Sequence, residues 1–398
     1  AVRSHVSHDR LRSAMPELTF LGEYGIITYA MKLGNAQFAK PPFAFVGGGL
    51  VHQGHLRFLR CRERLSRRNT KYRGGRIPMD KPFLTLDEQV NRLESRGLLV
   101  DTRTRWILER EGYYSVVNGY KWPFLDEGES AEAGDDRYKR GASFRDIYHL
   151  FSFDRKLRHL VFEYTMLAEA TLKTVVAYRF SAEHRDEVNP YLNPDNYDAD
   201  KSGKAGALIQ ILQKIIKPPA HGRQEGRNRS DCQPYLLHYQ EKHDGEIPLW
   251  VLTNAMTLGQ TFWLYQCVPA KVRGAIAESF ENLYADSHKH SLPKKTISMK
   301  KLDAIYQRMR QFRNICAHDE RLYCARPHDR NASVWQLIQD FMLVVDKKRY
   351  QEFLQKICSL IGYLRKCLPG YWDVIVREMG FTDFESEMSE LMSKIEKL

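Results

Sequence analysis

The feature that most constrains the fold is an apolar stripe along residues 144–184. Its members recur at intervals of three and four residues: Ile147, Leu150, Phe151, Leu157, Val161, Tyr164, Ala168, Val175 and Val176. That spacing keeps one face of a helix apolar for about ten turns. We therefore expect a long core helix here.

The other periodic segments also have helical spacing, and no segment alternates polar and apolar residues as a strand does. Thr85 with Glu88 three residues later predicts a helix start, and Asn118-Gly119 predicts the end of a second helix over 104–117. The acidic residues 126–136 are expected to form a loop. Further helices are predicted over 205–216, 248–265 with Pro248 in its first turn, 270–284 and 296–317. The last segment, 334–368, is predicted to form one long helix or a pair of helices. The expected fold is all-α.

Composition narrows the class of protein. Of the 398 residues, 43% are apolar and 28% are charged, as in ordinary globular chains. No run reaches the roughly 18–20 apolar residues of a membrane helix, and no export pattern opens the chain. The cysteines number seven and are scattered, which does not suggest a disulfide framework. We expect a cytoplasmic protein of several packed units.

The net charge of +12 suggests a polyanionic partner, but one segment carries most of it. Residues 1–78 hold 14 Lys and Arg against 4 Asp and Glu, which leaves 47 basic and 45 acidic residues in 79–398. The main part of the chain is therefore nearly neutral. This balance favours a focused cleft over a broad basic surface.

Residues 1–78 show neither helical nor strand periodicity, and helix signals begin only after Met79. Arg73-Gly74-Gly75-Arg76 also back-translates into a purine-rich codon run of the ribosome-binding type, just before Met79. We expect 1–78 to be translated upstream sequence; the alternative is a genuine basic, disordered arm. The expected units that follow are a helical subdomain over 79–140, a helical core over 141–330 and C-terminal helices over 331–398 that pack on the core.

The predicted helix over 296–317 carries the residues of chemical interest. Its apolar stripe comprises Leu302, Ile305, Met309, Phe312 and Cys316. Arg310, Asn314 and His318 are four residues apart and share a second face, with Arg313 beside them. The helix dipole favours a cationic imidazole at this end. An exposed set of two arginines, an amide and an imidazole is therefore expected.

The segment from Arg313 to His318 resembles the R-x4-H motif, in its R-N-x-x-[AC]-H form, of the HEPN superfamily of helical nucleic-acid-processing domains. The bare spacing also occurs at Arg3/His8 and Arg179/His184. Only the Arg313 copy has Asn directly after the Arg and lies at a predicted helix end.

A longer stretch, from about Lys81 to Tyr323, resembles the Abi-like family of bacterial abortive-infection proteins, of the AbiD/AbiF type. The sequence departs from the family pattern at Leu249, where Ile is common, and at Asp319, where a second His is frequent. The matching pieces, in the family's order, are Lys81-Pro82-Phe83-Leu84, Arg96-Gly97-Leu98, Tyr113-Tyr114, Asn118-Gly119-Tyr120, Phe144-x-x-Ile147-Tyr148, Phe151 through Asp154-Arg155 with Leu157, Pro248-Leu249-Trp250, Thr257-Leu258-Gly259, the motif itself and Arg321-Leu322-Tyr323.

The resemblance implies a HEPN-type helical core with metal-independent RNA cleavage in active members and no cofactor. His318 would act as general base or acid, Arg313 would clamp the phosphate with its planar fork, and Asn314 would orient the imidazole or bind phosphate. Because one copy offers one imidazole, the resemblance also implies a homodimer in which two motifs face one cleft.

Five further cations are candidate RNA contacts: Arg310, Arg321, and the loop residues Arg223, Arg227 and Arg229. The alternative for the loop over 218–231 is an ordinary solvated surface. The alternative for the motif itself is a helix cap without catalysis.

Other polar residues favour structural roles. A zinc site of Cys316, His318, Cys324 and His328 is disfavoured because no C-x-x-C pair is present and Cys316 belongs to the apolar stripe. Asp154 and Glu169 are expected as buried hydrogen-bonding partners or surface charges. Core packing is expected for Tyr113, Tyr114 and Tyr120, although they could stack on bases.

Two functions therefore remain open. The first is a phage-defence endoribonuclease, and the second is a non-catalytic protein that holds a small structured regulatory RNA.

Overall fold

The computed structural model describes residues 83–217, 232–288, 296–327 and 332–397, which all belong to one compact unit, 80–398. This part of the chain is all-α, as expected: it has no strand, and only two isolated β-bridges join extended residues. None of its helices is long and apolar enough to cross a membrane. The segment 1–78 and the predicted start at Met79 lie outside the described residues and stay predictions.

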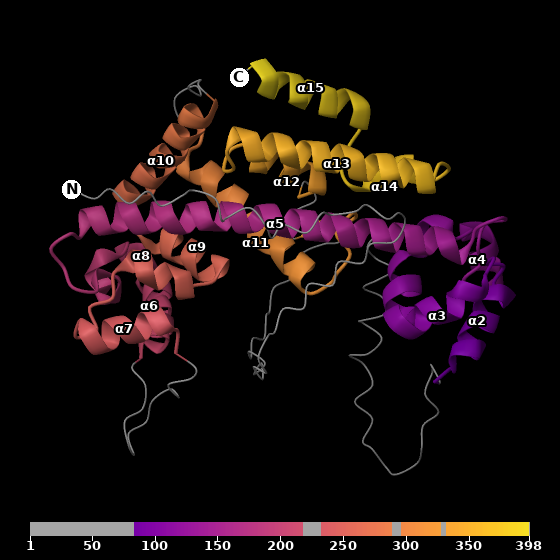
Figure 1. Ribbon diagram of the computed structural model, residues 1–398, viewed down its shortest axis with the longest axis horizontal. Helices are drawn as coiled ribbons and strands as arrows, with labels where there is room; N and C mark the ends of the chain where they lie inside the picture. Colours follow the sequence, from indigo (N-terminus) through magenta and orange to yellow (C-terminus); the bar gives the residue numbers. More distant parts are fainter. Residues whose placement is uncertain (1–82, 218–231, 289–295, 328–331, 398) are drawn as a thin grey trace, which may run out of the picture. The chain divides into compact units, whose positions relative to one another are not determined.

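The long core helix is confirmed as α5 (Phe144–Glu183), which has 40 residues (Figure 1). Ser143 and Asp146 form a capping box at its start, and its apolar stripe is almost entirely buried. Five helices pack on α5: α8 (Leu249–Leu252), α9 (Leu258–Cys267), α10 (Ala270–His288), α11 (Met299–Ala317) and α13 (Lys347–Cys367). One helix therefore organises the core.

The N-terminal helices begin where the sequence predicts but divide differently. Thr85 and Glu88 form the expected capping box of α2 (Leu86–Ser95). The helix predicted over 104–117 is wrong, because Gly112 at φ 80° ends α3 (Thr102–Glu111) and a separate π-helical turn follows (Tyr114–Asn118). After a 3-10 turn (Trp122–Phe124), the acidic stretch also departs from the predicted loop, since Asp126 caps a short helix, α4 (Glu127–Ala133).

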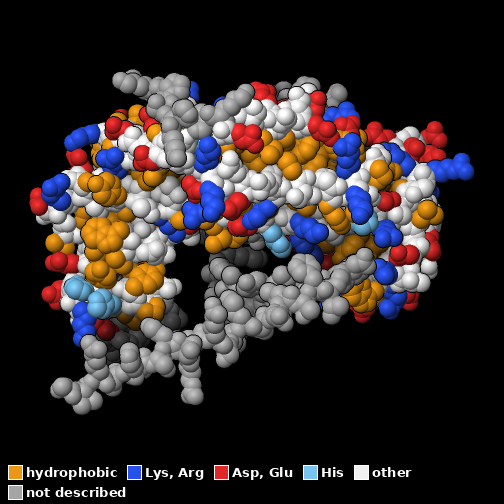
Figure 2. All heavy atoms as spheres, turned by 45° about the horizontal axis from the view of Figure 1, so that its top comes forward, with side chains coloured by type: hydrophobic (Ala, Val, Ile, Leu, Met, Phe, Trp, Pro, Cys, Tyr) orange, Lys and Arg blue, Asp and Glu red, His pale blue; other side chains and the backbone are white. Residues whose placement is uncertain are grey.

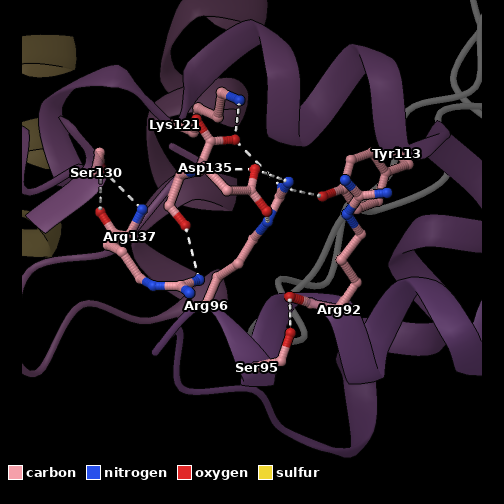
Figure 3. Close-up of polar contacts among 9 residues, drawn as sticks. Arg92, Ser95, Arg96, Tyr113, Lys121, Ser130, Asp135 and Arg137 are labelled. Atoms are coloured by element: carbon pink, nitrogen blue, oxygen red, sulfur yellow. Dashed lines mark hydrogen bonds and ion pairs between the residues drawn. The ribbon is translucent and has the colours of Figure 1, made fainter. Parts of the chain in front are cut away.

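A polar network ties these N-terminal elements together (Figure 3). The buried Arg96 guanidinium, at the end of α2, forms ion pairs with Asp135 and Asp136 and donates a hydrogen bond to the Tyr113 hydroxyl. Lys121 also pairs with Asp136. Arg96 and Tyr113 both belong to the sequence pieces noted above, so these pieces serve to hold α2, α3 and the segment after α4 in register.

The middle of the chain contains α6 (Ser202–Ile216) and α7 (Pro234–Lys242), with short 3-10 turns before α6 (Pro190–Leu192, Pro194–Asn196 and Ala199–Lys201). The single helix predicted over 248–265 is wrong. Pro248 lies at the N-cap of the short α8, a 3-10 turn follows (Thr253–Ala255), and Thr257 starts α9 with its own capping box to Gln260. The Thr257 side chain satisfies an N–H at the new helix start, which stabilises the break.

The C-terminal region has two helices within 334–368, which confirms the predicted pair, and two more follow beyond that range. These are α12 (Val334–Phe341), α13, α14 (Trp372–Glu378) and α15 (Phe384–Lys397). Asp346 caps the start of α13 and so separates it from α12. Arg308 of α11 pairs with the buried Asp340 of α12 through two hydrogen bonds of 2.6 and 2.8 Å. This bidentate pair fixes α11 against α12.

The buried His288 makes stability depend on pH. Its ring stacks on Tyr284, its Nδ1 lies 2.9 Å from the Tyr284 carbonyl, and its Nε2 has no partner among the described residues. Burial lowers the pKa of His288, so below about pH 6.5 the unfolded chain binds the extra proton more readily than the folded protein.

Lowering the pH from about 7.5 to about 5.5 should therefore decrease the free energy of unfolding of wild type by up to about 1 kcal/mol more than that of His288→Phe. Urea denaturation measures this difference, and equal losses would contradict it.

Candidate active site

The chemistry predicted for α11 rests on a buried apolar face. Leu302, Ile305, Met309 and Phe312 are completely buried, which confirms the predicted stripe. Cys316, the last member, is partly buried, and burial raises the pKa of its thiol to about 12. The thiol is therefore protonated near neutral pH and is a poor nucleophile. The reactive groups of this helix end must come from its exposed side.

The helix ends at the motif histidine in a tight turn. His318 is the C-cap residue, and Asp319 adopts a left-handed conformation at φ 57°. The N–H of Asp319 donates to the Cys316 carbonyl (3.5 Å), and the N–H of Glu320 donates to the Ile315 carbonyl (3.1 Å). This is the Schellman arrangement, in which glycine is the usual left-handed residue. An aspartate there needs a compensating interaction.

Arg158 of α5 supplies that interaction. Its guanidinium forms an ion pair of 2.5 Å with Asp319 and also contacts Asp154 and the Tyr120 hydroxyl, each at 2.8 Å. The Arg158 side chain is 2% exposed, whereas that of Asp319 is 66% exposed. Arg158 therefore links the protein interior to the surface turn that carries His318.

Asp154 completes the support from within α5. Its carboxylate is completely buried and accepts hydrogen bonds from the backbone N–H groups of Leu322 (3.0 Å) and Tyr323 (2.8 Å). It also accepts one from the Tyr120 hydroxyl (2.7 Å). Burial raises the pKa of Asp154, while these donors and Arg158 stabilise the charged form and offset part of that cost. Asp154 is thus the buried hydrogen-bonding partner that the sequence suggested.

The motif residues lie above this support. The Arg313 guanidinium lies 5.9 Å from the centre of the Phe162 ring, and its Nη1 is 3.5 Å from Oδ1 of Asn314. Asn314 and His318 are exposed. No hydrogen bond or ion pair holds the His318 side chain within the described residues, so its imidazole is available to a ligand.

The second R-x4-H spacing in the described residues is in a different state. Arg179 donates a hydrogen bond of 2.7 Å to Ser279, and Nδ1 of His184 lies 2.8 Å from a Glu187 carboxylate oxygen. In this copy the Arg179 guanidinium and one ring nitrogen of His184 are therefore held by neighbouring side chains, and the other nitrogen, Nε2, is buried. Of these two copies, only the Arg313 copy leaves its imidazole without such a partner.

The candidate RNA contacts are only partly brought together. Arg310 bonds to Gln307 (3.2 Å), and its side chain lies beside Gly259 of α9. Arg321 is partly buried and directly precedes the two N–H groups that bind Asp154. The remaining three candidates lie outside the described residues: Arg223, Arg227 and Arg229.

The expected structural roles hold for some polar residues. Glu169 forms an ion pair with Lys173 (2.8 Å), Tyr120 is buried and Tyr113 is partly buried. Core packing is wrong for Tyr114, which follows the turn at Gly112 and is 76% exposed. His328, the fourth residue of the zinc alternative, lies outside the described residues.

Sequence reasoning did not identify Arg158 and Asp319 as parts of the site. The available signal was the i,i+4 spacing of Asp154 and Arg158 within the apolar region of α5. Two opposite charges one turn apart on a buried face indicate an internal ion pair. The partner Asp319 could not be found in this way, because it lies more than 160 residues away in sequence.

The buried carboxylate should matter far more to stability than the exposed one. Asp154→Asn leaves Arg158 buried with only a surface partner, so we expect it to lower the free energy of unfolding by about 3–5 kcal/mol. Asp319→Gly removes the exposed carboxylate but also relieves the left-handed strain, so a change within about 1 kcal/mol is expected. Urea denaturation of both variants measures this contrast. Equal losses would contradict the assigned support.

Comparison with known proteins places the chain in a family. The family model described as Abi-like protein matches residues 106–324, more than half of the chain. No curated protein and no solved structure gives a significant match. The matched region contains α5, α11, the R-x4-H motif and the Asp154–Arg158 support. The chain therefore belongs to the Abi-like protein family.

Proposed function

We propose that this Abi-like protein acts in abortive infection, a bacterial defence against phage, as a HEPN-type endoribonuclease. The observation that carries the proposal is the end of α11. There Arg313 and Asn314 contact each other, His318 is exposed without a side-chain partner among the described residues, and Arg158 anchors the adjoining turn. An imidazole on a firmly held helix end can transfer a proton, and a neighbouring cation and amide can bind and stabilise a phosphate, as phosphodiester cleavage needs.

The reaction needs no bound cofactor for its proton transfers. A base removes the proton of an RNA 2′-hydroxyl, whose oxygen forms a bond to the adjacent phosphorus as the bond to the 5′-oxygen breaks. An acid returns a proton to the leaving 5′-oxygen. The products are a 2′,3′-cyclic phosphate and a 5′-hydroxyl. His318 is assigned one proton transfer, and Arg313 stabilises the charge that develops on the phosphate.

A second proton-transfer group is supplied in this proposal by a second copy of the chain. Each described unit presents one motif imidazole, and a two-fold axis beside the α11 ends would bring two sets of Arg313 and His318 together. Figure 2 shows Lys and Arg interspersed with Asp and Glu over one face of the molecule. A composite cleft would contain four cationic or imidazole groups, because each of the two copies contributes one Arg313 and one His318.

A non-catalytic RNA-binding function is the second candidate. One observation favours it: no acceptor among the described residues orients the His318 imidazole, whereas catalytic bases are usually oriented by a third group. In this case Arg313 and His318 would only contact phosphates of a small structured regulatory RNA. Cleavage assays separate the two functions.

Loss of the motif side chains should abolish cleavage without unfolding the protein. We expect His318→Ala and Arg313→Ala each to lower the cleavage rate by at least about 100-fold, because each removes a group that acts on the phosphate. Melting temperature and helical content should change little, since both side chains lie outside the core. Cleavage should persist in EDTA and give 2′,3′-cyclic phosphate ends.

His184→Ala is the matched control, because it alters a histidine with the same R-x4-H spacing whose ring is already paired with Glu187. Its cleavage rate should equal that of wild type. Persistent cleavage in both motif variants would refute the assignment, and a strict Mg²⁺ requirement would indicate a different mechanism.

The composite site predicts how mixed dimers behave. If both histidines of a dimer are needed, an equal mixture of wild-type and His318→Ala subunits should retain about one quarter of the wild-type activity, because that fraction of dimers has two intact motifs. Independent subunits would retain one half. Cleavage measured after subunit exchange distinguishes these values, and a proportional loss would contradict the shared cleft.

A further inference from the structure

The outer face of α3 carries an aromatic side chain between two cations. Arg103, Trp106 and Arg110 are spaced by three and four residues and therefore share one face of the helix. Trp106 is 53% exposed, and the Arg110 guanidinium lies 4.7 Å from the centre of its ring. Tyr114, which is 76% exposed, follows just beyond the turn at Gly112. Two large aromatic side chains are thus presented to solvent within nine residues.

Packing does not account for this exposure. The inner face of α3 is formed by the buried Thr104, Ile107 and Leu108, and α3 packs on α2. The indole of Trp106 lies on the opposite side, where Arg110 covers one of its faces. No aliphatic side chain of α3 accompanies it on that outer side. An exposed ring between two arginines, beside which Glu109 lies near Arg105, is typical of a stacking surface and not of an apolar protein contact.

The acidic side chains of α3 and its cap do not neutralise this face. Asp101 caps the helix by accepting N–H groups, Glu109 lies near Arg105, and Glu111 binds Arg155 through two hydrogen bonds. Arg103 and Arg110 form no ion pair within the described residues. Their charges therefore remain available to an anionic ligand.

The C-terminal end of α3 is linked to the candidate active site. The Glu111–Arg155 ion pair of 2.6 Å joins the end of α3 to α5. Arg155 lies three residues before Arg158, whose guanidinium contacts Asp319 beside His318. The end of α3 and the turn that carries His318 are therefore both anchored to the same stretch of α5, at Arg155 and Arg158.

We propose that this face of α3 is a binding surface for single-stranded RNA that enters the site. Bases stack on Trp106 and Tyr114, while Arg103 and Arg110 contact phosphates. The inference rests on the proposed function in that RNA is the ligand of both. It assigns to the N-terminal helices a role in affinity that is separate from cleavage.

Binding is best measured in the full-length His318→Ala protein, so that cleavage cannot interfere. The probe is a fluorescein-labelled, unstructured oligonucleotide of about 12 nucleotides, a length that stacking surfaces commonly accommodate. Trp106→Ala should weaken its affinity by about fivefold to a hundredfold, because one base loses its stacking partner. Trp106→Tyr should restore most of the affinity, since it keeps an aromatic ring. Arg103→Gln with Arg110→Gln should reduce the slope of log affinity against log salt by about 1.4.

The matched control is Trp250→Ala on α8. Trp250 is 59% exposed, close to the value for Trp106, but no Lys or Arg lies over its ring in the described part of the chain. This variant should bind the probe as tightly as the parent protein. Melting temperatures of all variants, measured alongside, should agree with that of the parent because these side chains are outside the core.

An unchanged affinity in Trp106→Ala would overturn the proposal. The proposal would also be overturned if Trp106→Ala kept its RNA affinity but formed an assembly of different mass in light scattering. In that case α3 would be an interface with another protein chain. If the α3 variants lose affinity as expected but wild type cleaves no RNA, the binding surface is supported and the ribonuclease assignment fails alone. Failure of either proposal can therefore be recognised separately.

Discussion

The completely buried carboxylate of Asp154 is the interaction on which the site depends. A charge inside a helical core costs several kcal/mol unless donors surround it, and here two backbone N–H groups, the Tyr120 hydroxyl and Arg158 do so. These donors come from α5 itself and from two distant segments of the chain, at Tyr120 and at Leu322–Tyr323. The cost of leaving the carboxylate unsatisfied therefore forces α5, the residues after α11 and the N-terminal helices into one register.

This support explains how a surface helix end can present functional groups in a fixed place. The apolar stripe of α11 and the Arg308–Asp340 pair hold the helix, and the Arg158–Asp319 pair holds the turn that follows it. Strain at a left-handed aspartate is thereby offset by an ion pair. Arg313, Asn314 and His318 need no structural role of their own, in contrast to His184, whose ring is occupied by Glu187.

The N-terminal helices contribute in two ways. Arg96 and its acidic partners keep α2, α3 and the segment after α4 together, and Glu111 connects α3 to α5. Once these contacts are made, the outer face of α3 has no packing duty, and its Trp106 side chain remains exposed. The division between an inner structural face and an outer binding face follows from which charges are already paired.

The sequence by itself determined the helical class, the long α5, the capped start of α2, the buried stripe of α11 and the position of the motif at a helix end, because these depend on local spacing and capping. It did not determine where helices break: Gly112, Thr257 and Asp346 end or restart elements whose apolar spacing continues through them. Only the tertiary structure joined Asp154 to Leu322 and Arg158 to Asp319, and left Tyr114 in solvent. Such pairings depend on how helices far apart in the chain pack, and side-chain periodicity carries no information about them.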